Sequence, residues 1–171
     1  LGAGTGKYAA GRRRDVQDCL KECRSGVAAW IMPLHRVFSD MRPEAGMFDI
    51  VIVDEASQAG TDASFLHYLA PRVLVIGDDK QVAPEAPGLD ISEVHALVRN
   101  YLGNISAWLK RLYRNPGTSF FDQAKLRTTT VTLKEHFRCV PEIIAFSNQH
   151  FYEPVGITLV PVRQYGTDRL P

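Results

Sequence analysis

Two adjacent carboxylates end an apolar run in the first half of the chain, where Asp54 and Glu55 directly follow residues 50–53. Nucleotide hydrolysis needs such a pair, because one carboxylate holds Mg²⁺, usually through water, and its neighbour orients or deprotonates the attacking water. We therefore assign the magnesium role to Asp54 and the role of general base to Glu55. The competing interpretation is an acidic pair that only turns the end of a strand into solvent.

A second apolar run, residues 73–76, ends in Gly77-Asp78-Asp79 and is followed by Gln81 and Pro84. In an open α/β sheet, ligands bind at the carboxyl ends of the strands. We therefore expect Asp78 and Gln81 to meet the first acidic pair at one edge of a sheet. A simple Gly-Asp turn that leaves the sheet is the alternative interpretation.

A single arginine, Arg138, follows a third apolar run and precedes Pro141. A proline in this context predicts the first turn of a helix, so the arginine would be held at a junction between elements. Such a cation can neutralise charge that develops on a transferred γ-phosphoryl group. The alternative is a surface arginine beside Glu135.

The elements that position these residues are predicted from continuous apolar runs that alternate with helical segments. Continuous runs are typical of parallel strands buried on both faces by helices, which predicts an α/β fold with right-handed crossovers. The predicted strands are residues 27–32, 49–53, 72–76 and 130–133, and the predicted helices between them are 62–69, 91–101, 105–113 and 119–126. A further helix, about 141–151, precedes a run at 157–162, which we expect to open a second domain and to be poorly anchored.

The order and separation of these motifs resemble superfamily 1 nucleic-acid helicases, in the branch that includes the nonsense-mediated-decay helicase. The second motif of that branch reads Asp-Glu-Ala-x-Gln, as residues 54–58 do, and the third reads Gly-Asp-x-x-Gln-x-x-Pro, as residues 77–84 do. The fourth motif is reproduced by Leu133, Phe137, Arg138, Pro141, Ile143, Phe146, Phe151 and Tyr152. The resemblance covers about residues 27–152 and departs at His136, where the branch usually has Gln.

The resemblance implies a partial RecA-like domain of the P-loop nucleoside triphosphatases, with a parallel sheet flanked by helices, over residues 25–137. A peripheral lead-in, 1–24, would precede it, and 138–171 would begin a second RecA-like domain. The implied cofactors are ATP and Mg²⁺. The implied partners are single-stranded DNA or RNA and the remaining helicase domains of a longer parent chain.

The resemblance also implies a role for each site residue. Asp54 would belong to the magnesium shell, Glu55 would be the catalytic base, and Gln58 would contact the nucleotide. The pair Asp78 and Gln81 would sense the γ-phosphate and link hydrolysis to domain closure. From the second domain, Arg138 would reach the γ-phosphate.

The start of the chain does not reproduce a phosphate-binding loop, which reads Gly-x-x-x-x-Gly-Lys-Ser/Thr. Leu1 stands at the first glycine position and Tyr8 at the hydroxyl position, so we interpret this segment as a Gly-rich linker and expect the loop upstream. Trp30 is interpreted as part of a buried core strand, with contact to a single strand as the alternative. Cys19 and Cys23 are expected to be partly buried thiols rather than metal ligands.

Composition adds limits rather than a function. The net charge is +1, which gives no reason by itself to expect binding to a polyanion. No run approaches the roughly 20 apolar residues of a membrane span, and we expect a cytoplasmic protein without membrane contact. Besides an ATP-dependent helicase or translocase, two functions stay open: a nucleic-acid-stimulated ATPase switch in a restriction, repair or defence protein, and a non-catalytic scaffold derived from such a motor.

Overall fold

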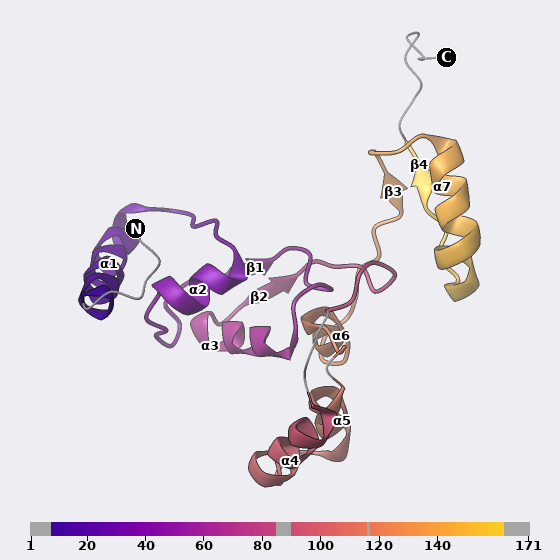
Figure 1. Cartoon of the computed structure of the whole chain (residues 1–171). Helices are drawn as coiled ribbons and strands as arrows, with labels where there is room; N and C mark the ends of the chain where they lie inside the picture. Colours follow the sequence, from indigo (N-terminus) through magenta and orange to yellow (C-terminus); the bar gives the residue numbers. More distant parts are fainter. Residues whose placement is uncertain (1–7, 85–89, 116, 163–171) are drawn as a thin grey trace. The chain divides into compact units, whose positions relative to one another are not determined.

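The computed structural model describes residues 8–84, 90–115 and 117–162 of the chain (Figure 1). The chain divides into two compact units, which are described separately below. Unit 1 combines Leu1–Val53 with Asp62–Val75, and unit 2 combines Asp54–Thr61 with Ile76–Pro171. Among the described residues, helices and short parallel strands alternate, so the expected α/β class is confirmed at this level.

Unit 1 contains a parallel pair of short strands and the helices beside it. β1 pairs with β2 in the register Val51↔Val73, Ile52↔Leu74 and Val53↔Val75. The rings of Phe38 and Phe65 lie 4.3 Å apart between their centroids. The elements are α1 (Ala9–Cys23), η1 (Arg24–Gly26), α2 (Leu34–Asp40), β1 (Val51–Val53), η2 (Thr61–Phe65), α3 (Leu66–Leu69) and β2 (Val73–Val75).

Unit 2 contains a helical pair, a short helix with its own cap and a second parallel strand pair. The helices α4 and α5 pack against each other, and β3 pairs with β4 (Figure 1). The elements are α4 (Ile91–Tyr101), α5 (Ala107–Arg114), α6 (Phe120–Lys125), β3 (Glu135–His136), α7 (Pro141–Ser147), the π-helical turn η3 (Asn148–Tyr152), η4 (Glu153–Val155) and β4 (Val160–Pro161).

Two helices of unit 2 begin where the sequence places a capping residue. The carboxylate of Asp90 accepts a hydrogen bond from the backbone N–H of Ser92 at 2.7 Å and starts α4. Ser119 and Asp122 form a reciprocal capping box that starts α6. Such caps satisfy backbone N–H groups that a helix leaves without partners. The predicted helices 91–101 and 119–126 agree with α4 and α6 within one residue at each end.

Two predicted strands are absent from the described residues. Residues 27–32 form no strand, and Ile31 is fully exposed. Residues 130–133 also form none, with Val131 81% and Leu133 80% exposed. An apolar run becomes a strand only where a neighbouring strand can satisfy its backbone hydrogen bonds, and neither run has such a neighbour in the described structure.

The expectation that helices cover both faces of the sheet is wrong for the described residues. In each strand of the β1–β2 pair the middle residue is the most exposed, with Ile52 59% and Leu74 49% exposed. Their flanking valines are only half-buried. Successive residues of a strand point to opposite faces, so one face of this pair is open in the described structure.

The final strand is better anchored than the sequence predicts, because β4 has a parallel partner. Val160 donates its backbone N–H to Lys134 at 2.7 Å, and Val162 donates to His136 at 2.8 Å. The Asn148 side chain also bonds both the N–H and the carbonyl of Leu159 at 2.9 Å. The prediction of a poorly anchored end is therefore wrong as far as residue 162.

Candidate functional site

The two acidic segments follow strands that end side by side. Because β1 and β2 are parallel and in register, their carboxyl ends, Val53 and Val75, lie at the same edge of the pair. The pairing continues into the segments that follow, where the N–H of Ala56 donates to the carbonyl of Ile76 at 2.8 Å. The structure therefore brings residues 54–58 next to residues 76–81.

The first segment is a tight turn with an unusual backbone. Glu55 has φ = +52°, in the left-handed region that residues with a side chain rarely adopt. Its N–H donates to Asp54 Oδ1 at 3.0 Å, and its carbonyl accepts the N–H of Gln58 at 2.9 Å. Backbone outliers of this kind cost on the order of 1–3 kcal/mol and persist only where the surroundings impose them.

The middle of the turn is buried while its carboxylates are exposed. Ala56 is 0% exposed and Ser57 3% exposed, so these two residues anchor the turn in the protein interior. Asp54, Glu55 and Gln58 are exposed. Gln58 Nε2 lies 3.5 Å from Glu55 Oε2, which gives the Glu55 carboxylate a donor on its own turn. The turn thus exposes the two carboxylates to solvent while its backbone is anchored by buried residues.

The second segment is organised by the carboxylate of Asp78. Its Oδ1 accepts the N–H of Lys80 at 2.9 Å, and its Oδ2 accepts Gln81 Nε2 at 3.1 Å. The backbone closes the same turn, because the N–H of Gln81 donates to the Asp78 carbonyl at 3.2 Å. A carboxylate that accepts local N–H donors in this way fixes a loop. Asp78 and Gln81 therefore act as one unit.

A buried serine joins the two segments. The N–H of Asp78 donates to Ser57 Oγ at 3.3 Å. Next to it, Gly77 leaves no room for a side chain, since a Cβ there would lie 2.9 Å from a ring carbon of Phe121 and 3.1 Å from the Ser57 nitrogen. Close approach of backbone to a ring is a reason to place glycine at this position.

Helix α6 supports both segments from one side. The N–H of Phe120 donates to the Ala59 carbonyl at 2.8 Å, and the N–H of Phe121 donates to the Ala56 carbonyl at 3.2 Å. Phe120 itself is 0% exposed. These bonds use N–H groups of the first helical turn, so the start of α6 is fixed on the acidic turn.

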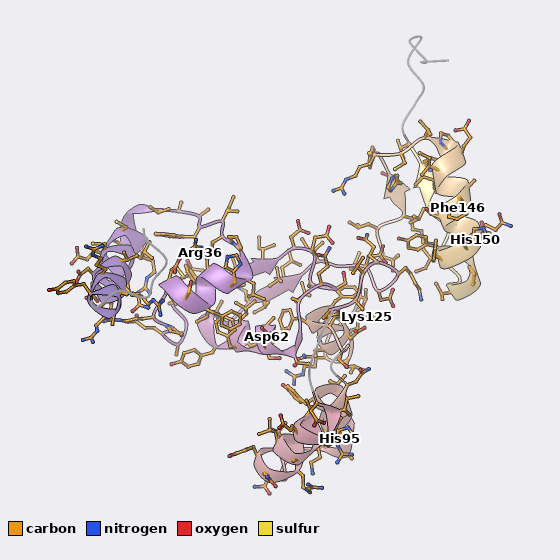
Figure 2. All side chains as sticks on the ribbon, in the orientation of Figure 1. Arg36, Asp62, His95, Lys125, Phe146 and His150 are labelled. Atoms are coloured by element: carbon orange, nitrogen blue, oxygen red, sulfur yellow. The ribbon has the colours of Figure 1, made fainter. Side chains whose placement is uncertain are left out.

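The same helix also contributes a cation. Lys125, labelled on α6 in Figure 2, donates to Asp79 Oδ2 at 2.5 Å and lies 5.6 Å from the centroid of the Phe121 ring. The hydrogen bond from Lys125 is the main reason that the pKa of Asp79 is lowered from its ordinary value. Asp79 is therefore engaged with α6, whereas Asp78 organises the loop.

The Asp78 carboxylate has one more donor, from far along the chain. The hydroxyl of Tyr152, in η3, donates to Asp78 Oδ2. Burial, followed by the hydrogen bond to this carboxylate and its charge, raises the pKa of the Tyr152 phenol well above its ordinary value. A tyrosine phenol is already protonated at neutral pH, so Tyr152 is a hydrogen-bond donor there.

Arg138 lies in the connection between β3 and α7, where it is exposed. The predicted helix start is confirmed, because Pro141 occupies the first turn of α7. Thus the structure gathers Asp54, Glu55 and Gln58 on one turn and Asp78 and Gln81 on its neighbour, with Arg138 in a separate connection. The chemical roles assigned to these residues stay predictions.

Three residues that support this site were given no role by the sequence. Ser57, on the first segment, bonds the second one, and Phe121 and Tyr152 reach Gly77 and Asp78 from distant parts of the sequence. Ser57 offers a usable signal, since a small polar residue directly follows the acidic pair and Ala56. For Phe121 and Tyr152 the sequence separation from Gly77 and Asp78 hides the contact.

Other sequence expectations meet mixed outcomes. Cys19 and Cys23 are exposed rather than partly buried, because they lie on α1, which buries none of its residues. No group of three metal-binding side chains occurs among the described residues. Trp30 is half-buried outside any strand, so the core-strand interpretation is wrong. The Nε2 atom of His136 is buried without a hydrogen-bond partner in the described structure.

The structure bears only in part on the start of the chain and on membrane-spanning helices. Apart from Tyr8, which is exposed, the segment 1–8 lies outside the described residues. None of the helices that the structure describes is long and apolar enough to cross a lipid bilayer.

The comparisons with known proteins point to one helicase. Over 110 residues, or 62% of its length, the chain is 28% identical to the mouse protein named 5'-3' DNA helicase ZGRF1. The matched region is 5% of that relative's length, so the chain spans a small part of it. No protein-family model and no solved structure matches the chain. The chain is thus similar, at a low level and over part of its length, to a DNA helicase.

Proposed function

We propose that this chain is part of the motor of an ATP-dependent superfamily 1 DNA helicase or translocase, and that it carries the residues that hydrolyse ATP. The observation that carries the proposal is the pair of acidic segments at the ends of β1 and β2, joined by the Ala56–Ile76 and Asp78–Ser57 hydrogen bonds. Ligands of parallel α/β sheets bind at such an edge. The similarity to a DNA helicase supports the same conclusion.

In this proposal Glu55 takes the proton of the attacking water. A general base must be accessible to water and held in place. Glu55 is exposed, its backbone is fixed in the left-handed region, and Gln58 lies within 3.5 Å of its carboxylate. Gln58 would then have two roles, because it contacts the nucleotide and also orients Glu55 on the turn that they share.

Asp54 is the residue that would hold Mg²⁺, and its chemistry fits that ion. Mg²⁺ in nucleotide sites takes oxygen ligands and uses one or two carboxylates, water and substrate phosphates rather than a protein cage. Asp54 is an exposed carboxylate at a strand end, and its Oδ1 already accepts the N–H of Glu55. When bound, the ion would neutralise charge on the phosphates.

Asp78, Gln81 and Arg138 complete the proposed set. Gln81 is exposed and its amide is oriented by Asp78. A γ-phosphate that bonds Gln81 would therefore change the position of the loop 77–81. Arg138 precedes α7 and would stabilise charge on the transferred phosphoryl group. The RecA-like fold, the second RecA-like domain from residue 138 and a phosphate loop in the parent chain belong to the same proposal.

The proposed partner is single-stranded DNA, because the helicase that the chain matches is named a DNA helicase. The net charge of +1 does not drive binding to nucleic acid by itself. Contact with the strand would therefore depend on particular residues, of which Trp30 is a candidate, and on the remaining domains of the parent protein.

The test is ATP hydrolysis by the full-length protein that contains this chain, measured with and without single-stranded DNA and RNA. A helicase motor should hydrolyse ATP, respond to single strands and separate a duplex. Stimulated hydrolysis without strand separation would instead identify an ATPase switch. Absence of any hydrolysis would overturn the proposal and favour a scaffold.

A further inference from the structure

The carboxylate of Asp78 collects donors from two distant parts of unit 2. Two of them, the Lys80 N–H and the Gln81 amide, belong to its own loop. The third is the Tyr152 hydroxyl, which lies 74 residues further along the chain. Gln81 and Tyr152 donate to the same oxygen, Oδ2, so the tyrosine fixes the oxygen that orients Gln81.

Tyr152 is held firmly at its own end. It is the last residue of η3, the π-helical turn that continues α7. Asn148, at the start of η3, is buried and bonds Leu159 through both side-chain atoms at 2.9 Å. A π-helical turn widens the helix and shifts the direction of the side chains beyond it, and such turns are frequent at functional sites.

A polar residue of the proposed set therefore lies close to each end of the helical segment 141–152. Arg138 lies three residues before its first residue, and Tyr152 is its last. The aromatic cluster that includes Phe146 and His150, labelled in Figure 2, belongs to the same segment, with ring centroids 4.4 Å apart. A displacement of this segment would change the Arg138 position and the Asp78 contact together.

We propose that Tyr152 is a positioning residue that couples the segment 141–152 to the loop 77–81 through its hydrogen bond to Asp78. The proposal rests on the function proposed above, because the coupled loop contains Gln81. The bond is between a neutral donor and a carboxylate, which is stronger than a bond between neutral groups. The contact also contributes to the raised pKa of the phenol, because a hydrogen bond to a carboxylate favours the protonated form of the hydroxyl.

The contact itself is tested without nucleotide, by hydrogen exchange of the full-length protein. Tyr152→Phe removes only the hydroxyl, and we expect the backbone amides of residues 77–84 to exchange about tenfold faster, the ratio that corresponds to one charged hydrogen bond of modest strength. Tyr101→Phe is the matched control, because Tyr101 is 79% exposed on α4. Unchanged exchange in Tyr152→Phe would overturn the proposal.

The positioning role is tested by steady-state ATP hydrolysis. Tyr152→Phe should lower kcat about tenfold with little change in KM for ATP, because the hydroxyl orients Gln81 and does not bind the nucleotide. When Tyr152→Phe is combined with Asp78→Asn, it should lower kcat much less, because the carboxylate that accepts the hydroxyl is gone. Equal losses in both backgrounds would overturn the role. A full-length protein that hydrolyses no ATP would refute the proposed function, while the exchange result would still decide the contact.

Discussion

Two parallel strand pairs occur in the described structure, and they hold their functional candidates in different ways. β1–β2 ends in two segments that bond to each other through Ala56, Ile76, Ser57 and Asp78. β3–β4 is only two residues long on each side, and it depends on the Asn148 side chain for added support. The first pair thus fixes several polar groups together, whereas Arg138 lies exposed in the connection that follows β3.

The two strand pairs also differ in the residues that support the segments next to them. In the segments 54–58 and 76–81, small buried residues and hydrogen bonds from α6 fix the backbone and leave the carboxylates of Asp54 and Glu55 exposed. Between β3 and β4, Arg138 lies in the connection that precedes the helical segment 141–152, and that segment ends at Tyr152, which bonds Asp78. In the proposed function, the first region supplies the groups that hydrolyse ATP, and the second supplies Arg138 and the Tyr152 contact to Asp78.

The largest effect that would separate the two regions is expected for Arg138→Ala. If Arg138 stabilises charge on the transferred phosphoryl group, kcat of the full-length protein should fall about 10³-fold or more. Arg138→Lys keeps the charge without the planar donor geometry and should recover only part of the loss. Steady-state ATPase assays measure both variants, and a kcat near wild type for Arg138→Ala would leave the second region without a catalytic group.

A smaller, structural effect is expected where the first region is tightest. In Gly77→Ala the added Cβ would lie 2.9 Å from the Phe121 ring and 3.1 Å from the Ser57 nitrogen, so the ring or the turn must shift. We expect a loss of about 1–3 kcal/mol in the free energy of unfolding. Urea unfolding measures this loss. Gly103→Ala is the control, because its nearest atom lies at 3.6 Å, and equal stability of the two variants would contradict a tightly packed edge.

The cap of α6 should contribute less. Ser119 is 3% exposed, its Oγ accepts the N–H of Asp122 at 3.0 Å, and its own N–H donates to Asp122 Oδ2 at 3.0 Å. Ser119→Ala should therefore cost about 1 kcal/mol of unfolding free energy. Ser119→Thr keeps the hydroxyl oxygen and should retain most of this stabilisation. Urea unfolding of both variants checks the cap, and a neutral Ser119→Ala would show that α6 does not need it.

The smallest effect is expected for the ion pair between α6 and the second segment. The folded-state pKa of Asp79 is lowered, chiefly by its hydrogen bond with Lys125, so the pair adds stability above the unfolded pKa of about 4. That stability is lost as pH falls through the lower folded value. Because both side chains are about a third exposed, Lys125→Met should cost at most about 1 kcal/mol at pH 7.

The pH dependence provides the check on this prediction. The difference in unfolding free energy between wild type and Lys125→Met should shrink when the pH is lowered from 7 to 3. Lys134→Met is the control, because Lys134 is exposed and lies directly before β3 rather than on α6. A difference that is constant across this pH range would show that the pair does not explain the lowered pKa.

Much of the site's framework could be predicted from the sequence, because strong local signals mark it. Asp90 and Ser119 cap helices that were placed within one or two residues, and the β-branched runs before Asp54 and Gly77 form the parallel pair. Both runs are bounded by polar or glycine residues that end a strand in a fixed direction. The shared edge of the two acidic segments follows from that direction.

The remaining features could not be predicted, because they depend on tertiary contacts. Residues 27–32 and 130–133 are as apolar as the true strands, but neither has a strand partner among the described residues. The left-handed backbone of Glu55 is one that glutamate rarely adopts, and no local pattern marks it. The Tyr152–Asp78 bond joins residues that no local pattern connects.

The most direct test of the central claim is the chemical step in Glu55→Gln of the full-length protein. Glutamine keeps the size of the side chain but cannot accept the proton of the attacking water. A general base contributes typically about 10²–10⁴-fold, so kcat for ATP hydrolysis should fall by that factor. Affinity for ATP and for single-stranded DNA should stay near wild type. A near-normal kcat would show that Glu55 is only a strand-end carboxylate and would contradict the hydrolytic role of this edge.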